Sequence, residues 1–366
     1  MSSKRELLQH TKQMPNHRIN RDLYWDFWKG CAIISVVIIH ALFSTRDFQP
    51  GTFNNNFGLY FRQLLMFAVP IFFGIAGYFS INPNQKFSSR DFLKSRTKRL
   101  LPPYLVWTLI YTAVQQGPEA LNLHLLIKKL ALGTGIGIGY FVIALFQWIL
   151  ITPLLLKIKR LKTGILISIA LTILSTIFYY HFSFVDAESF FSSFPGNALP
   201  FFAWSPFYLV GFLVKKFDCR AITNKQYLRV ALFAYLTFLI LSIIEAHTLN
   251  AYGLQSLATS QLKLTSKLMS LNLLILILSK KLPGADQLSG KATLICTLGQ
   301  RSYSVYLTHM IFMPTTIILL SKFPEIYQLQ PLFVALTATI VIGLSITLDR
   351  SFKALLPKNN FALIFG

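Results

Sequence analysis

The first long apolar stretch carries three side chains that could do chemistry. Residues 26–43 read DFWKGCAIISVVIIHALF, and the strongly polar groups in this run are Asp26, Lys29 and His40. On a helix, Asp26 and Lys29 are one turn apart and can form an ion pair. Lys29 and His40 share a face, about 16 Å apart along the axis. Such groups are costly in a bilayer and usually functional, although a snorkelling lysine and a hydrogen-bonded histidine explain them equally well.

A basic stretch at 92–104, FLKSRTKRLLPPY, is a second candidate. Arg96 and Arg99 share a face if the helix begins early. Two guanidinium groups can clamp a phosphorylated ligand because each binds phosphate oxygens bidentately. The surrounding loop holds six basic residues, so an anchor at the cytoplasmic membrane surface is the simpler alternative.

A third candidate is the stretch 298–312, LGQRSYSVYLTHMIF. His309 is predicted about 15 Å from the start of its helix, a depth similar to that of His40. Two imidazoles at matched depth could share one cavity, while a hydrogen-bonded core histidine is the alternative for each. The same stretch also offers three hydroxyl groups, on Ser302, Tyr303 and Tyr306.

The composition predicts an all-α, polytopic integral membrane protein. Of 366 residues, 54% are hydrophobic and only 13% are charged, about half the charged fraction of a soluble domain. Apolar runs of spanning length recur along the chain. About ten transmembrane helices are expected, near 27–45, 58–80, 100–115, 139–157, 163–181, 198–214, 228–246, 264–280, 301–320 and 331–349.

The distribution of basic residues predicts the orientation. If the N-terminus is cytoplasmic, 26 of the 35 Lys and Arg residues lie in inward segments and six in outward ones, as the positive-inside rule requires. Both termini are then cytoplasmic. We expect a basic N-terminal segment (1–24), one transmembrane domain (25–350) and a cytoplasmic tail (351–366). The net charge of +22 is thus a topology signal, and we expect no nucleic acid partner.

Two predicted outward loops are less informative. The loop 116–138 runs into GTGIGIG, whose spacing is not that of a dinucleotide fingerprint. We favour a flexible connection to the next span over a re-entrant lid. The loop 182–197 is rich in aromatic and hydroxyl residues, which could contact a sugar. The three widely spaced cysteines lack the pattern of a metal site, and we expect no metal.

The motifs together resemble the membrane acyltransferase-3 family, integral-membrane O-acyltransferases that modify bacterial surface glycans. Asp26-x-x-Lys29-Gly30 followed by Val37-Ile38-Ile39-His40 resembles its first span. Many members have Arg where this chain has Lys29; the lysine form is similar to the polysaccharide and fucose acetylase branch. The likeness extends from about 22 to 350. Further similar stretches are VPIFFGIAGYF (69–79), Arg96-x-x-Arg99 with LLPPY, YFVIALFQWIL (140–150), FYLVGFLV (207–214) and LGQRSYSVYLTH (298–309).

The resemblance implies roles for the candidate residues. Acetyl-CoA, the acyl donor, would bind from the cytoplasm with Arg96 and Arg99 on its phosphates or near its thioester. His40 would act as general base on an acceptor hydroxyl, or carry the acyl group, as its ordinary pKa suits. Asp26 and Lys29 would position the cytoplasmic end or shape the donor channel. His309 would hydrogen-bond in the core or align the acceptor.

The resemblance also implies a setting and partners. We expect the bacterial cytoplasmic (inner) membrane, with capsule or exopolysaccharide, or a lipid-linked oligosaccharide, as acceptor. Membrane lipid is a further expected partner, and an oligomer is compatible with the family. The competing hypothesis is a proton-coupled transporter or flippase of a glycan or lipid-linked sugar, because intramembrane His, Lys and Asp also build proton relays. Binding of acetyl-CoA would separate the two.

Overall fold

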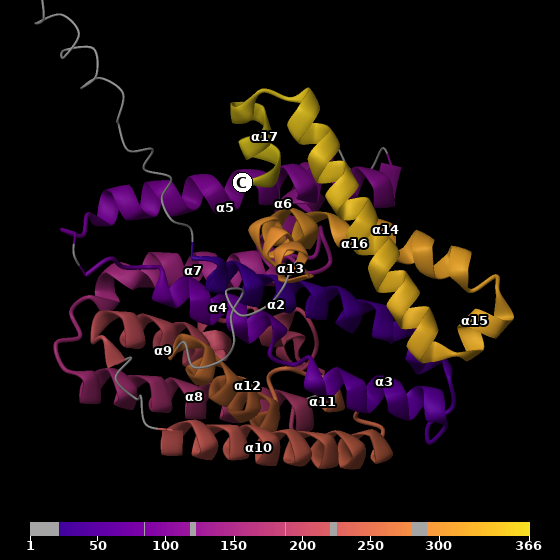
Figure 1. Cartoon of the computed structure of the whole chain (residues 1–366), viewed down its shortest axis with the longest axis horizontal. Helices are drawn as coiled ribbons and strands as arrows, with labels where there is room; N and C mark the ends of the chain where they lie inside the picture. Colours follow the sequence, from indigo (N-terminus) through magenta and orange to yellow (C-terminus); the bar gives the residue numbers. More distant parts are fainter. Residues whose placement is uncertain (1–21, 84, 118–121, 187, 220–224, 280–290) are drawn as a thin grey trace, which may run out of the picture.

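The computed structural model describes residues 22–366 apart from 84, 118–121, 187, 220–224 and 280–290 (Figure 1). Most of the predicted basic segment 1–24 therefore lies outside the described residues. Within the described part, the regular structure is helical and contains no strand, as predicted. The α-helices are α2 Leu23–Ala41, α3 Phe53–Leu64, α4 Ala68–Tyr78, α5 Ser89–Gln116, α6 Leu123–Leu132, α7 Tyr140–Leu155, α8 Leu161–Phe184, α9 Ser205–Lys216, α10 Lys225–Ala251, α11 Gln255–Ala258, α12 Leu264–Leu278, α13 Lys291–Gln300, α14 Ser302–Leu320, α15 Pro324–Gln328, α16 Gln330–Leu355 and α17 Lys358–Phe365.

Six helical segments are long and apolar enough to cross a membrane, judged within the described residues. Two shorter apolar helices, α7 and α12, coincide with further predicted spans. The predicted span 100–115 falls in α5, whereas 198–214 comprises the 3-10 helix Phe201–Trp204 and most of α9. The fold thus supports a multi-pass helical protein, with six spans recognisable by length and composition. The six segments are Leu23–Asp47, Phe53–Tyr78, Leu161–Phe184, Leu228–Ala251, Ser302–Leu320 and Gln330–Leu355.

Proline divides one apolar segment of the bundle and leaves another continuous. α5 is a single helix through Pro102 and Pro103. The second span is instead divided into α3 and α4 between Leu64 and Ala68. Pro70 explains the division, because it has no amide hydrogen and its ring clashes with the carbonyl of Met66, four residues earlier.

α2 lies in the middle of the bundle (Figure 1) and packs against α4, α13, α14 and α16. The helix begins at Leu23 because the Asp22 carboxylate caps it, accepting a hydrogen bond from the Tyr24 amide. Its side chains at Ala32, Ile33 and Val37 are almost completely buried. The candidate groups on α2 are therefore held by neighbours on several sides.

The outer faces of α8 and α10 are, in contrast, apolar and exposed, as expected for contact with lipid. The exposed side chains on these two helices include Leu166, Ile173, Ile177, Phe233 and Ile240.

α2 and α13 touch backbone to backbone at two glycines. A Cβ on Gly299 would overlap the carbonyl oxygen of Asp26, and a Cβ on Gly30 would overlap that of Ile295. Small residues permit such close helix approach in membranes. Because α14 follows α13 directly, this contact also sets the place of His309 relative to α2.

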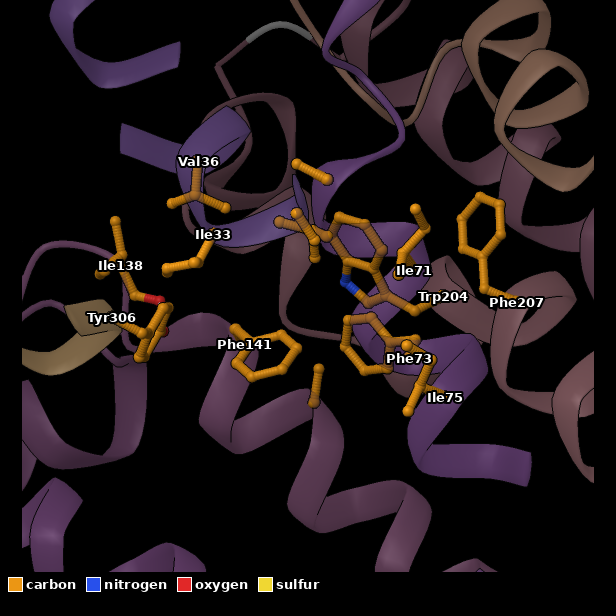
Figure 2. Close-up of a cluster of buried hydrophobic side chains, with 14 of the residues drawn as sticks. Ile33, Val36, Ile71, Phe73, Ile75, Ile138, Phe141, Trp204, Phe207 and Tyr306 are labelled. Atoms are coloured by element: carbon orange, nitrogen blue, oxygen red, sulfur yellow. The ribbon is translucent and has the colours of Figure 1, made fainter. Parts of the chain in front are cut away.

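An apolar cluster joins α2 to the rest of the core (Figure 2). Phe73 on α4 stacks on Trp204 with ring centroids 5.0 Å apart, and meets Phe141 on α7 edge-on at 5.0 Å. Tyr306 on α14 lies beside Ile138 at the other end of the cluster. These contacts hold helices that are far apart in sequence around the C-terminal half of α2.

We predict that Gly299→Ala destabilises the protein, because the added methyl group has no room between α2 and α13. Overpacking of this kind costs about 1–3 kcal/mol. Thermal denaturation of the detergent-purified chain, followed by size-exclusion chromatography, measures the effect. The matched control is Gly343→Ala on α16, where a Cβ meets open space and the melting temperature should stay or rise slightly. Equal melting temperatures for both variants would contradict the close contact.

Candidate functional site

His40 and His309 lie side by side at the centre of the site. His40 is in the last turn of α2, His309 is in the first half of α14, and their ring centroids are 5.4 Å apart. The Nδ1 atom of His309 lies 2.9 Å from the carbonyl oxygen of Tyr306 and 3.0 Å from that of Val305. Since carbonyl oxygens only accept, this Nδ1 carries the hydrogen and the lone pair is on Nε2.

Two imidazole nitrogens of this pair have no hydrogen-bond partner within the described part of the chain. They are Nδ1 of His40 and Nε2 of His309, and both are buried. Buried polar atoms are nearly always paired. His40 lines a cavity and can meet a hydroxyl or N–H group that enters it, whereas His309 is fully buried.

His40 lines a cavity of about 340 Å³, which we call the outer cavity. Its wall combines charged, aromatic and amide side chains from segments far apart in sequence. Arg46 comes from the 3-10 helix Leu42–Asp47 that follows α2, and Arg62 comes from the last turn of α3. The wall also contains Tyr140, Tyr179, Phe194, Asn197, Trp204, Ser256, Ser260 and Gln261.

The glycine-rich segment 133–139 contributes to the outer cavity. Ile136 and Ile138 are 1% and 4% exposed, and Gly137 and Ile138 line the cavity. The Tyr306 hydroxyl donates to the Ile138 carbonyl. This segment is packed into the core, so the expectation of a loose connection to α7 is wrong. The physical reason is its small residues, which let the backbone lie against Thr108 of α5.

A second cavity of about 440 Å³, the inner cavity, contains most of the other predicted residues. Lys29, Arg96 and Arg99 bring three positive charges to its wall. The hydroxyl of Tyr303 donates to the Leu100 carbonyl, 2.7 Å away. Apolar side chains form much of the remaining surface, including Phe72, Ile75, Phe141, Leu145 and Ile149.

The charges at the inner cavity differ in how they are balanced. Lys29 Nζ lies 2.6 Å from the Asp26 carboxylate, as the i,i+3 spacing predicts. Asp26 is 2% exposed, so Lys29 compensates a buried charge. The Arg96 side chain is half-buried and donates a hydrogen bond to the Phe79 carbonyl. This burial lowers the pKa of the Arg96 guanidinium. The Arg99 side chain, in contrast, is exposed. An anionic ligand would complete this pair.

The two cavities share part of their walls. Val36, Val69 and Tyr306 line both of them. His40 therefore stands on one side of a shared wall, and the basic residues stand at the far side of the inner cavity. A molecule reaching from the basic residues along the apolar surface would point toward His40.

The structure brings the sequence-predicted residues together in two groups. His40 and His309 form the first, and the second comprises Lys29, Arg96, Arg99, Ser302, Tyr303 and Tyr306 around the inner cavity, with Asp26 behind Lys29. Sequence reasoning missed Arg46 and Arg62. An arginine inside an apolar span is itself a signal, and both lie toward the side that should be poor in basic residues.

The fold and the two cavities define the class: a multi-pass helical membrane protein with a buried histidine pair and two cavities that are both lined by basic residues. The chain belongs to the acyltransferase-3 family, because residues 22–350 match that family's acyltransferase domain. The resemblance noted from its motifs is thereby confirmed.

Individual relatives agree with this assignment. The chain is 26% identical over 288 residues to the putative membrane-bound acyltransferase YfiQ of Bacillus subtilis, an alignment covering 73% of each chain. It is 39% identical over 94 residues to the nodulation protein NolL of Mesorhizobium japonicum, and 38% identical over 99 residues to NolL of Sinorhizobium fredii. These two alignments span only about a quarter of either chain. No solved structure shows a significant match.

We predict that Lys29→Met lowers the stability of the protein by about 1–3 kcal/mol, because the buried Asp26 carboxylate loses its cationic partner. Denaturant unfolding of the purified chain measures the loss. The double variant Asp26→Asn/Lys29→Met should recover part of it, since the buried charge is then absent as well. A double variant no more stable than Lys29→Met alone would show that the pair is not what stabilises this end of α2.

Proposed function

We propose that this protein is an acyl-CoA-dependent O-acyltransferase. It transfers an acetyl group from acetyl-CoA across the membrane to a hydroxyl of a cell-surface polysaccharide or a lipid-linked glycan. The observation that carries this proposal is the wall shared by the two cavities at Val36, Val69 and Tyr306. It links a basic inner site to an imidazole that faces a second, outer site.

The orientation in this proposal rests on the basic residues. Arg96 and Arg99 belong to an inward loop with six basic residues, so the inner cavity faces the cytoplasm, where acyl-CoA is found. Both termini are cytoplasmic, and the helices α5, α7, α9 and α12 complete ten crossings of the bacterial cytoplasmic membrane. The outer cavity then faces the side on which surface glycans are assembled.

The inner cavity suits the phosphate groups of acyl-CoA and the flexible chain that joins them to the thioester. Arg96 and Arg99 hold phosphate oxygens, for which guanidinium groups are suited by their paired N–H donors. Lys29, held by Asp26, adds a third positive charge beside them. The apolar wall of the inner cavity then directs the thioester toward the shared wall, and excludes water that would hydrolyse it.

His40 does the chemistry at the outer end. A ring nitrogen of His40 that faces the outer cavity accepts the proton of the acceptor hydroxyl as that oxygen bonds to the thioester carbonyl carbon. The carbon–sulfur bond breaks, and the CoA thiolate leaves toward the cytoplasm with a proton returned by the imidazolium. An acyl-imidazole carried by His40 is the alternative route, and it uses the same nitrogen.

His309 orients His40 in either route. Its Nδ1–H is fixed by two backbone carbonyls, so its Nε2 can only accept. An N–H of His40 turned toward it leaves the other nitrogen of His40 free as a base. A base oriented by a third group in this way is a recurrent catalytic arrangement.

We predict that His40→Ala reduces glycan O-acetylation by about 100-fold or more, the usual contribution of general acid–base catalysis. The measurement is alkali-released acetate from surface glycans of cells that carry the wild-type chain, the variant or no chain. His124→Ala on the exposed face of α6 is the matched control and should leave acetylation unchanged, while both variants accumulate in the membrane.

Two results would count against the proposal in different ways. Wild-type acetylation in His40→Ala would remove His40 from the mechanism. Equal acetylation in cells with and without the chain, together with proton-dependent glycan flux into vesicles containing the purified protein, would establish a transporter instead.

We predict that Arg96→Ala/Arg99→Ala weakens binding of labelled acetyl-CoA by about tenfold or more, because charge-assisted hydrogen bonds to phosphate are lost. Equilibrium binding to the detergent-purified chain measures this. Lys94→Ala/Lys98→Ala removes the same charge from exposed positions of α5 outside the cavity and should bind nearly as well as wild type. A similar loss in both double variants would indicate a general surface charge effect and no dedicated site.

A further inference from the structure

The outer cavity contains a second pair of guanidinium groups that the proposed reaction does not use. Arg62 donates from Nη1 to the Ile39 carbonyl at 3.1 Å and from Nε to the Thr259 carbonyl at 3.0 Å. Arg46 donates from Nη2 to the Thr259 hydroxyl at 2.9 Å. The two guanidinium carbons lie 4.4 Å and 5.1 Å from the centre of the Phe43 ring. One aromatic ring and one threonine thus hold both cations at a single place.

These two charges have no counter-charge within the described residues. No carboxylate lies within 4 Å of either guanidinium, and the wall of the outer cavity contains no Asp or Glu. Their hydrogen bonds in the structure go to neutral oxygens. Because both side chains are half-buried, leaving their charge unpaired is costly.

Structural roles explain only some of the N–H donors of Arg46 and Arg62, and they do not explain the positions of these two residues. Arg62 satisfies one of the last carbonyls of α2 and complements the negative end of its dipole. Its bonds to the Ile39 and Thr259 carbonyls use two of its five N–H donors. Positive-inside anchoring cannot explain either arginine, because Arg46 and Arg62 lie beyond His40, at the end of α2 away from Lys29. The remaining donors are available to an anion.

The rest of the outer cavity suits a sugar attached to that anion. His40 lines the same wall as the arginines, so a bound anion would place neighbouring hydroxyls near the imidazole. The Oε1 atom of Gln261 is buried without a hydrogen-bond partner in the part of the chain that the structure describes, and is free to accept from a hydroxyl. Aromatic faces for the ring are supplied by Tyr140, Phe194 and Trp204, and further polar groups by Asn197, Ser256 and Ser260.

We propose that Arg46 and Arg62 bind an anionic group of the acceptor, a carboxylate or a phosphate ester, so that the acetylated glycan is an acidic one. This inference rests on the proposed acyltransferase function. The pair acts as a specificity determinant. Its paired N–H donors bind the anion bidentately, and the position of the bound anion determines which hydroxyl of the glycan reaches His40. A neutral glycan would leave the two cations unpaired and bind more weakly.

The test uses labelled acetyl-CoA, the full detergent-purified chain and surface glycan prepared from cells that lack it. The glycan is divided into an untreated pool, a pool with its carboxyl groups reduced to alcohols and a pool stripped of phosphate esters. We expect label in the untreated pool, and a loss of about tenfold or more in one treated pool. The affected pool identifies the anion as carboxylate or phosphate. Equal label in all three pools overturns the inference and leaves the acyltransferase function intact, whereas no label in the untreated pool refutes that function.

Variants separate an acceptor site from other uses of the pair. Arg46→Gln and Arg62→Gln should each raise the KM for the untreated glycan by about tenfold or more, with the KM for acetyl-CoA unchanged. Arg62→Lys, which keeps the charge, should recover part of the loss. Lys322→Gln, an exposed cation near the same end of the bundle, is the control and should match wild type. All variants are first checked for an unchanged melting temperature.

Two results with these variants would overturn the inference. A fall in kcat with an unchanged acceptor KM would show that the arginines stabilise the reacting oxyanion instead of selecting the acceptor. A lipid headgroup is the other source of phosphate, so transfer is also measured in vesicles of phosphatidylglycerol and of phosphatidylcholine. Activity that follows the lipid charge and ignores the glycan charge would assign the pair to lipid.

Discussion

An ionised side chain inside a membrane protein has little water to hydrate it, and this constraint governs the structure. Each buried charge in the described residues must find a partner or a use. Asp26 pairs with Lys29 at one end of α2. Lys263, fully buried, is held 2.7 Å from the Ser242 carbonyl and 3.6 Å from the Glu245 carboxylate. Where a charge lacks such compensation, as at the two arginines beyond His40, an anionic ligand is the remaining partner.

The same constraint explains why α2 is the central element. A helix that carries both an ion pair and an imidazole cannot face lipid, so it must be covered on most sides. Gly30 and Gly299 make this covering close by letting α13 lie directly on α2. The consequence for the site is geometric: α14 continues from α13, and its His309 is brought against His40.

The arrangement separates two kinds of chemistry along one axis. Three cations line the inner cavity and two line the outer cavity, and the apolar wall with Tyr306 lies between them. In the reaction that we propose, the thioester donor and the sugar acceptor are recognised from opposite sides without meeting in water. In a membrane acyltransferase, this division lets binding energy at the two ends align the groups that react between them.

Local features of this protein were determined by its sequence. The helical class, the Asp26–Lys29 pair and the membership of the acyltransferase-3 family all depend on residues close together in the chain or on motifs in fixed order. The tertiary structure decided the rest: that Arg46 and Arg62 meet at Thr259, that Ile136 and Ile138 are buried in the core, and that the imidazoles, 269 residues apart, are neighbours. The periodicity of a helix shows which of its faces is polar. Only packing determines which other helix that face meets, because many pairings bury similar apolar surface.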